Sequence, residues 1–211
     1  MELFSLWKKY AYLILFIFLL LSLLDYRVGV LAVICMLAPI VVSFRRGRFW
    51  CGNLCPRGSF YDHVLAKFSR KKKVPSFLKT TAFRVFVVLF MFSLFGLGIA
   101  KNWGDLAGIG LVFFRMIILT TLLGIGLAFI YNHRAWCCFC PMGSIAAFIA
   151  KLRKNRKALS VSQSCTACKL CSRECPFELA PYQYKNGPLS DPDCLHCTRC
   201  SDVCPQQSIG Y

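Results

Sequence analysis

The sequence predicts an all-α membrane bundle of four helices, built from two parallel hairpin repeats, followed by a small α+β domain rich in cysteine. Three observations predict this class. The 211 residues are 57% hydrophobic and 17% charged, whereas soluble domains have about 45–50% and about 25%. Apolar residues gather in four long blocks, and one cysteine motif occurs twice. The polar last quarter of the chain holds eight of the fourteen cysteines.

The four apolar blocks are candidate membrane helices. They cover residues 10–24, 28–44, 81–100 and 106–131, and a spanning helix needs roughly 20 apolar residues. The first block is short, but Lys8 and Lys9 before it can reach the headgroups. One long helix through the first two blocks would put Asp25 and Arg27 inside the bilayer, which is costly. We therefore expect two helices joined by a tight turn.

The distribution of basic residues predicts the orientation in the membrane. Residues 45–79 carry ten Lys or Arg and one acid, and residues 132–158 carry six and no acid. Lys and Arg accumulate in cytoplasmic connections. We therefore expect both termini, the central connection and the tail in the cytoplasm. The net charge of +17 is then a topology signal, and the composition excludes a simple nucleic-acid-binding protein.

The tail, residues 159–211, carries the cysteine spacing of a bacterial ferredoxin twice. Each run reads C-x2-C-x2-C-x3-C-P, in which three close thiolates wrap one cluster and the fourth cysteine binds the other cluster. Zinc sites use C-x2-C pairs separated by a longer stretch, and disulfides need an oxidising compartment. The sequence therefore predicts two [4Fe–4S] clusters. Their ligands are Cys165, Cys168, Cys171 and Cys204 for one, and Cys194, Cys197, Cys200 and Cys175 for the other.

The membrane domain, residues 1–158, contains an internal repeat with a period of about 85 residues. Residues 48–59 read RFWCGNLCPRGS and residues 134–144 read RAWCCFCPMGS. Both segments follow the pattern R-x-W-C, a short gap, then C-P-x-G-S. The two units cover about residues 1–73 and 80–157. Apolar residues at helical spacing after the second motif predict an amphipathic helix at the membrane interface; they are Ile145, Phe148, Ile149 and Leu152.

The repeat predicts a third iron–sulfur cluster at the membrane boundary. Parallel repeats are related by an axis along the membrane normal, which would bring four thiolates together, the ligand number of a cluster. The prolines suit first helical positions, so the preceding cysteines would lie at helix N-termini. The expected ligands are Cys51, Cys55, Cys137 and Cys140. Because the second motif is shorter, Cys138 could replace Cys137. The alternative is a set of reactive or structural thiols without a cofactor.

Helical hairpins with cysteine–proline motifs, followed by a two-cluster ferredoxin tail, resemble the NapH/NosR-type membrane ferredoxin proteins. The resemblance spans nearly the whole chain and implies a prokaryotic inner-membrane protein. Members of that family accompany periplasmic nitrate reductase and nitrous oxide reductase, and are viewed as electron carriers; a related group reduces copper during oxidase assembly. This sequence departs by its shortened second motif. It also lacks a large extracytoplasmic domain, so a flavin or haem partner would be another chain.

Four further residues stand out in the apolar blocks or beside the cysteine motifs. An intramembrane ionisable residue such as Arg115 is a functional candidate, either as a contact to a quinone or a partner's cofactor, or as a packing or snorkelling arginine. His63 and His133 lie beside the cysteine motifs and could contact the same ligand or carry protons, although both also fit as interfacial histidines. Cys35, alone in its block, is expected to be a small core residue.

Together these features predict an electron-transfer subunit of a membrane complex. Electrons would pass between the tail clusters, the boundary cluster and a membrane quinone or an extracytoplasmic redox partner, in either direction. Two other functions stay open: a quinol dehydrogenase or metal-ion (copper) reductase, and an assembly factor that delivers metal or sulfur. The sequence shows no evident constellation of acid, base and nucleophile, so turnover of a substrate by this chain alone is not expected.

Overall fold

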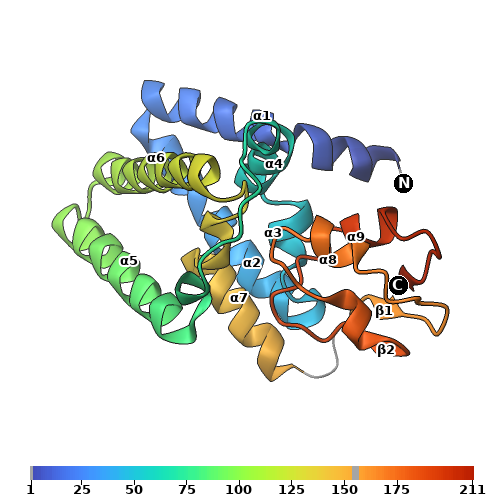
Figure 1. Ribbon diagram of the computed structural model, residues 1–211. Coiled ribbons are helices and arrows are strands. Elements are labelled where there is room, and N and C mark those ends of the chain that lie inside the picture. Colours follow the sequence, from blue (N-terminus) through green and yellow to red (C-terminus); the bar gives the residue numbers. More distant parts are fainter. Residues whose placement is uncertain (1, 154–156) are drawn as a thin grey trace.

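The computed structural model describes residues 2–153 and 157–211, with side chains from residue 6 onward. Helices form most of the molecule, and the cysteine-rich tail packs against one end of the long ones, beside α3 (Phe49–Asn53) (Figure 1). The predicted fold class is confirmed, with four apolar helices and a small ferredoxin-like unit that contains a short sheet. The junction predicted near residue 158 follows residues 154–156, which lie outside the described residues.

Four stretches of the described chain are long and apolar enough to cross a membrane: residues 6–24, 26–46, 81–101 and 106–130. The first belongs to α1 (Glu2–Leu24). The second joins the 3-10 helix η1 (Tyr26–Leu31) to α2 (Ala32–Arg46). The third and fourth are α5 (Thr81–Lys101) and α6 (Leu106–Ile130). These bounds agree with the four predicted blocks to within a few residues.

Short polar side chains set the ends of these helices. Asp25 ends the first span and caps η1, accepting a hydrogen bond from the backbone N–H of Arg27 at 2.9 Å. Thr80 caps α5, and the carboxylate of Asp105 accepts from Ala107 and Gly108 at the start of α6. Such caps satisfy N–H groups that have no partner inside the helix. The predicted division of the first two apolar blocks into separate helices is therefore confirmed, and Asp25 lies at the break between them.

The two cysteine motifs fold as matching breaks between helices. In the first repeat α3 is followed by α4 (Pro56–His63), and in the second η4 (Trp136–Cys138) is followed by α7 (Pro141–Leu152). Each proline occupies the first turn of its helix, as predicted. In α7 the small residues are buried, whereas Phe148 and Leu152 are exposed, which is the outward apolar stripe that the sequence predicted.

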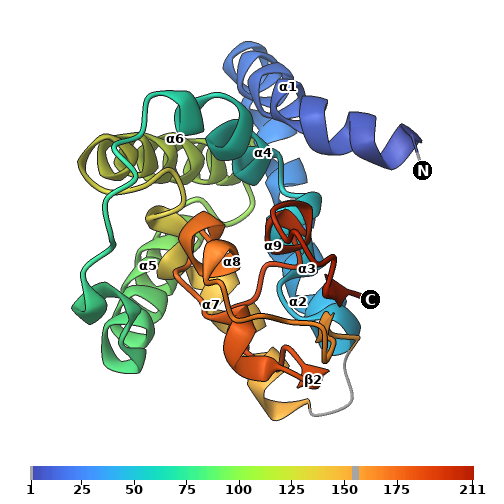
Figure 2. The same cartoon turned by 45° about the vertical axis from the view of Figure 1, so that its right-hand side comes forward.

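The tail folds around a small three-stranded sheet. Strand β1 (Ser160–Val161) lies between β2 (Gly187–Pro188) and β3 (Ile209–Gly210), and both pairs are antiparallel. Two short helices, α8 (Leu170–Glu174) and α9 (Arg199–Asp202), each carry the third cysteine of one run, and the fourth cysteine comes after the helix (Figure 2). The core of the tail consists of apolar side chains and thiols; its buried members are Leu159, Val161, Cys165, Cys171, Leu189, Cys194, Cys200 and Ile209.

Helix α6 and η1 approach each other at a pair of glycines. A Cβ atom on Gly110 would overlap the carbonyl oxygen of Tyr26, and one on Gly29 would overlap the carbonyl of Gly110. A backbone carbonyl group cannot rotate out of the way as the end of a long side chain can. The contact between the first hairpin and α6 therefore depends on glycine at both positions.

We expect Gly110→Ala to destabilise the membrane domain by roughly 1–3 kcal/mol, because overpacking forces the backbones apart. The measurement is the midpoint of thermal unfolding in detergent. Gly126→Ala, in the same helix, is the matched control, since nothing lies within 4 Å of its Cβ position. Equal midpoints for the two variants would contradict this close contact.

Candidate metal centres

The structure gathers the tail cysteines around two hollows. One is lined by Cys165, Cys168, Cys171 and Cys204. The other is lined by Cys175, Cys194, Cys197 and Cys200. These are the two sets that the spacing predicted, including the exchange of the fourth cysteine between runs. The first set lies toward solvent, because Cys168 is exposed.

The loops that present these cysteines have matching backbone conformations. Positive φ angles occur at Ala167 and Lys169 in the first run, and at His196 and Thr198 at the same places in the second. Non-glycine residues seldom adopt this region. Such turns direct successive N–H groups into a concave loop that suits an anionic centre. The backbone thus favours a negatively charged group in each hollow.

Without a bound metal, burial disfavours the charged thiolate form of the tail cysteines. It raises the pKa of both Cys194 and Cys200 to about 12. Iron would supply the positive charge that makes thiolates favourable. No three His, Cys, Asp or Glu side chains in the described residues are arranged around a single metal ion. A four-iron cluster binds each cysteine through a different iron, so its ligands need not converge on one point.

The four predicted boundary cysteines also come together in the structure. Cys51 is in α3 and Cys137 in η4, while Cys55 and Cys140 precede the first residues of α4 and α7. Burial raises the pKa of Cys51 to about 12, and the neighbouring thiols of Cys55, Cys140 and Cys137 act in the same direction, although Arg48 opposes them. The two repeats therefore place four thiols in one neighbourhood, each helix N-terminus contributing positive potential.

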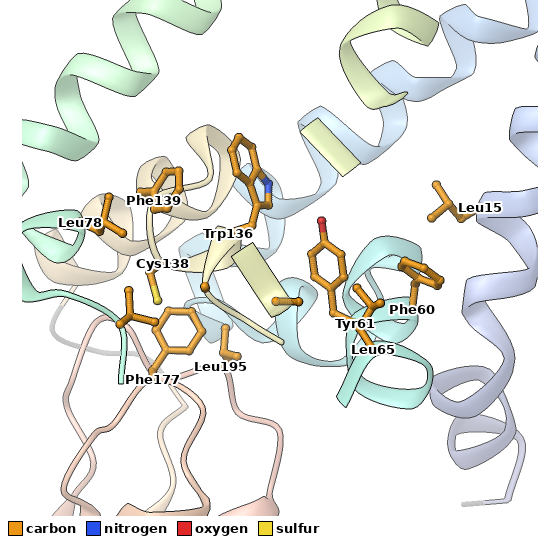
Figure 3. Packing of buried hydrophobic residues seen from close by; sticks show 13 residues of the cluster. Leu15, Phe60, Tyr61, Leu65, Leu78, Trp136, Cys138, Phe139, Phe177 and Leu195 are labelled. Carbon is orange, nitrogen blue, oxygen red and sulfur yellow. The ribbon is translucent and has the colours of Figure 1, made fainter. Parts of the chain in front are cut away.

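Cys138 lies elsewhere. Its side chain is fully buried in the apolar core beside the tail, and Figure 3 shows its sulfur turned toward Phe177. Burial raises the pKa of Cys138 to about 12, and the charged groups that act most on this thiol are Arg48 and Cys137. The arrangement favours Cys137 over Cys138 as the fourth boundary thiol.

Two buried arginines, one from each repeat, contact the cysteine motif of the other repeat. Arg48 of the first motif donates to the carbonyl oxygen of Cys137 at 2.6 Å, and Arg134 of the second donates to the carbonyl oxygen of Cys51 at 2.9 Å. A Cβ on Gly143 would clash with the Arg48 guanidinium, and one on Gly58 with that of Arg134. The Arg, the first Cys and the Gly of the repeated motif thus make the same contact twice, once in each direction between the repeats.

Each of these two arginines also binds a carboxylate that connects it to the tail. Arg48 contacts Asp193 at 2.7 Å, next to Cys194. Arg134 makes a bidentate pair with Asp62 at 2.8 and 2.6 Å, and Arg199 of the tail contacts the same carboxylate at 2.9 Å. Burial would raise the pKa of Asp62, but Arg134 more than offsets it and holds that pKa well below its usual range. Asp62 is therefore ionised at neutral pH.

Further contacts hold the second tail set against the boundary cysteines. Three backbone carbonyls of the tail accept hydrogen bonds from the membrane domain, at Cys197 from Lys8, at His196 from Asn53 and at Pro176 from Asn132. Phe177 and Leu195 share one apolar core with Trp136 and Cys138 (Figure 3). Cys175 and Cys197 pack against that same core, as do the boundary cysteines Cys51, Cys137 and Cys140.

Several buried donors beside the boundary cysteines have no partner among the described residues. They include the indole nitrogens of Trp50 and Trp136, which occupy equivalent places in the two motifs, and the hydroxyl of Tyr61. Buried polar groups normally find a hydrogen bond. The sulfides of a cluster accept such bonds, and these bonds help to set its potential. The donor set at this site therefore fits an iron–sulfur cluster.

A cavity of about 130 Å³ opens beside the boundary cysteines, between α2, α5 and α6. Its walls are mainly apolar. The polar groups on its lining include Arg57, which donates to the hydroxyl of Thr120 at 2.6 Å, together with Cys35 and Cys140. Four methionines line it, namely Met36, Met91, Met116 and Met142. Cys35 is therefore not the closed core residue that the sequence predicted, since it is exposed and faces this cavity.

Sequence reasoning missed Arg57 and Met142, although the repeat carried a signal. They occupy the variable place in C-P-x-G of the first and second motifs. The three side chains predicted as quinone contacts do not line this cavity. His133 lies 3.4 Å from Asp62, in the network that holds the tail. Burial lowers the pKa of both His63 and His133, which favours their neutral forms. Arg115 is exposed on α6.

Comparisons with known proteins agree with this organisation. Residues 28–75 and 106–159 match the model of a 4Fe-4S binding domain, and residues 164–209 match that of a 4Fe-4S dicluster domain. The chain is 26% identical over 187 residues to an uncharacterized protein of Methanocaldococcus jannaschii, covering 85% of this chain and 70% of that protein. It is 27% identical over 192 residues to regulatory protein NosR of Pseudomonas aeruginosa, covering 80% of this chain and 26% of NosR.

No solved structure matches the chain. The matches and the four apolar helices indicate a membrane iron–sulfur protein of the electron-transfer type. They support the NosR side of the predicted resemblance. The chain spans about a quarter of the length of NosR.

Asp62→Asn should loosen the attachment of the tail. The substitution leaves Arg134 buried without its anion, and breaking a buried ion pair costs roughly 3–5 kcal/mol. We expect a lower thermal midpoint and faster proteolytic release of the tail from detergent-solubilised protein. Glu178→Gln is the control, because its pair with Lys79 has side chains 25–28% exposed and such pairs contribute about 0–1 kcal/mol. Similar effects of both substitutions would contradict a central role for Asp62.

Proposed function

We propose that this chain carries electrons between the cytoplasmic face and the interior of a membrane through three iron–sulfur clusters. The tail would hold two [4Fe–4S] clusters on the cysteine sets that line its two hollows. Cys51, Cys55, Cys137 and Cys140 would hold the third at the membrane boundary. A bound cluster supplies reversible one-electron transfer at each position. The residues of the chain fix the spacing of the three sites and the charge around them.

One observation carries this proposal. The second tail set and the boundary cysteines pack against a single apolar core, and Arg48 joins them through hydrogen bonds to Asp193 and to the carbonyl of Cys137. The second tail set therefore lies between the exposed first set and the boundary site. The three sites therefore follow one another from the surface of the tail to the membrane bundle, as the centres of an electron path would.

The charge around the boundary site supports a cluster there. Four thiolates outweigh the positive charge of the iron–sulfide core, so a ligated cluster is anionic. Arg48 and Arg134 are each about 1% exposed, and each contacts a boundary cysteine. Asp62 and Asp193 keep these arginines in place. Buried charges need partners of opposite charge. An anionic cluster would be a second such partner for each arginine, beside its carboxylate.

For the acceptor or donor inside the membrane we propose a quinone. The cavity beside Cys140 is mostly apolar with few polar groups, which is the usual lining of a small-molecule site, and its volume of about 130 Å³ is smaller than that of most such sites. Arg57 can donate a hydrogen bond to a quinone carbonyl, and Thr120 orients Arg57. Reduction of a quinone takes two electrons, delivered one at a time, and two protons from water; oxidation of the quinol reverses this balance.

A second candidate, reduction of a soft metal ion such as copper, has one observation in its favour. The four methionines and two cysteines that line the cavity are soft ligands of the kind that select Cu(I). Arg57 opposes this function, because its positive charge lies on the same cavity wall. An assembly role, the remaining alternative, predicts labile clusters that pass on metal or sulfur.

The proposed orientation places the tail in the cytoplasm. The tail contacts Lys8 near the start of the first span and Arg84 near the start of the third. The basic stretches on both sides of the cysteine motifs therefore lie at the same end of the bundle as the tail. Basic connections face the cytoplasm, which supports a prokaryotic inner membrane with both termini inside.

The number of irons per chain tests the third cluster. Protein purified without oxygen should hold about 10–12 irons, since two four-iron clusters account for about eight. We expect Cys55→Ser and Cys140→Ser each to lose the same increment of iron and sulfide, while Cys35→Ser retains the full amount. A value near eight in the parent protein, unchanged by either serine, would overturn the boundary cluster.

Arg57→Gln tests the quinone site. Reduced protein in detergent should be reoxidised by a water-soluble short-chain quinone at least about tenfold more slowly in this variant, because one hydrogen bond to a charged donor is lost. Iron content and reduction by dithionite should be unchanged. Arg70→Gln, in the central connection, is the control. Unchanged reoxidation in Arg57→Gln, or faster reoxidation by Cu(II) than by quinone, would favour the soft-metal function.

A further inference from the structure

Helix α6 has one charged side chain on its outer face. Arg115 lies within the span formed by residues 106–130 and is exposed. The described structure gives its side chain no hydrogen bond and no ion pair. It follows the start of α6 by nine residues, or about 14 Å at 1.5 Å per residue. A charge at this depth in lipid is costly unless it has a partner.

The exposed face of α6 is a continuous stripe. At 100° per residue, the exposed residues Arg115, Leu119, Leu122 and Gly126 lie opposite the buried face of the helix. Their spacing of four, three and four residues is that of a helix-packing seam. Nothing lies within 4 Å of the Cβ position of Gly126, so a second helix could approach closely there. We call these four residues the outer α6 stripe.

We infer that the outer α6 stripe binds a membrane-spanning helix of a different protein, which carries an Asp or Glu opposite Arg115. The charge determines the chemistry of the partner, because in hydrocarbon an arginine is best matched by a carboxylate. A second copy of this chain cannot supply that group, since its four candidate spans contain no Asp or Glu. The partner is therefore a heterologous subunit.

This inference is independent of the proposed electron path. Arg115 is not among the residues that line the cavity beside Cys140. Loss of the partner helix should therefore leave the iron content and quinone reactivity of the purified chain unchanged. The two proposals can fail separately.

A defined peptide tests the charge match. The full-length protein and a synthetic Leu–Ala membrane-spanning peptide with one mid-span Glu are labelled and placed together in phosphatidylcholine vesicles. Energy transfer should report association about tenfold tighter than with the matching Gln peptide. Arg115→Gln should abolish the difference, and Arg115→Lys should retain it. Equal binding of both peptides by the parent protein would overturn the inference.

Cross-linking in the membranes of the native cell identifies the occupant. A photoreactive residue at Leu122 should form an adduct with the apolar span of another protein, and that span should contain Asp or Glu. The adduct should disappear in Arg115→Gln, whereas one formed from exposed Phe90 on α5 should persist. An adduct with a second copy of the chain, an adduct only with lipid, or an adduct that Arg115→Gln does not affect would each contradict the inference.

Discussion

The rest of the site depends on the hydrogen bonds by which Arg48 and Arg134 each hold the cysteine motif of the other repeat. Each guanidinium reaches the carbonyl of the other repeat's first motif cysteine, beside a glycine that leaves room for it. An arginine can make this contact because its planar fork donates in several directions at once. One edge holds the cysteine loop, and another holds a carboxylate. The boundary thiols can therefore come together only when both repeats are folded.

The same two arginines connect the membrane domain to the tail. Asp193 precedes a cysteine of the second tail set, and Asp62 shares its charge between Arg134 and Arg199 of the tail. The apolar core around Phe177 and Leu195 fills the space between these ion pairs. Charged contacts fix the position of the tail, while burial of apolar surface stabilises it. A protein that passes electrons between fixed centres needs this kind of rigid attachment, because the distance between the centres must not vary.

Much of this arrangement could be predicted from the sequence because it follows from local patterns. The spans follow from hydrophobicity, the starts of α4 and α7 from their prolines, and the tail sets from cysteine spacing. Contacts between the repeats could not be predicted residue by residue. The repeat predicted which cysteines would come together. It did not predict that Arg48 and Arg134 would each bind the other repeat, or that the side chain of Cys138 would be buried in the core. The cavity was missed because its lining comes from separate helices, and Arg57 could be recognised only by comparing the two copies of C-P-x-G.

On the proposed electron path, the second tail cluster and a boundary cluster are neighbours. Electron paramagnetic resonance of the fully reduced full-length protein would detect this, because two paramagnetic clusters at short range broaden and split each other's signals. We predict an interaction spectrum that collapses in Cys55→Ser to that of the two tail clusters alone. A parent spectrum identical to that of Cys55→Ser would show that no boundary cluster lies beside the second tail cluster.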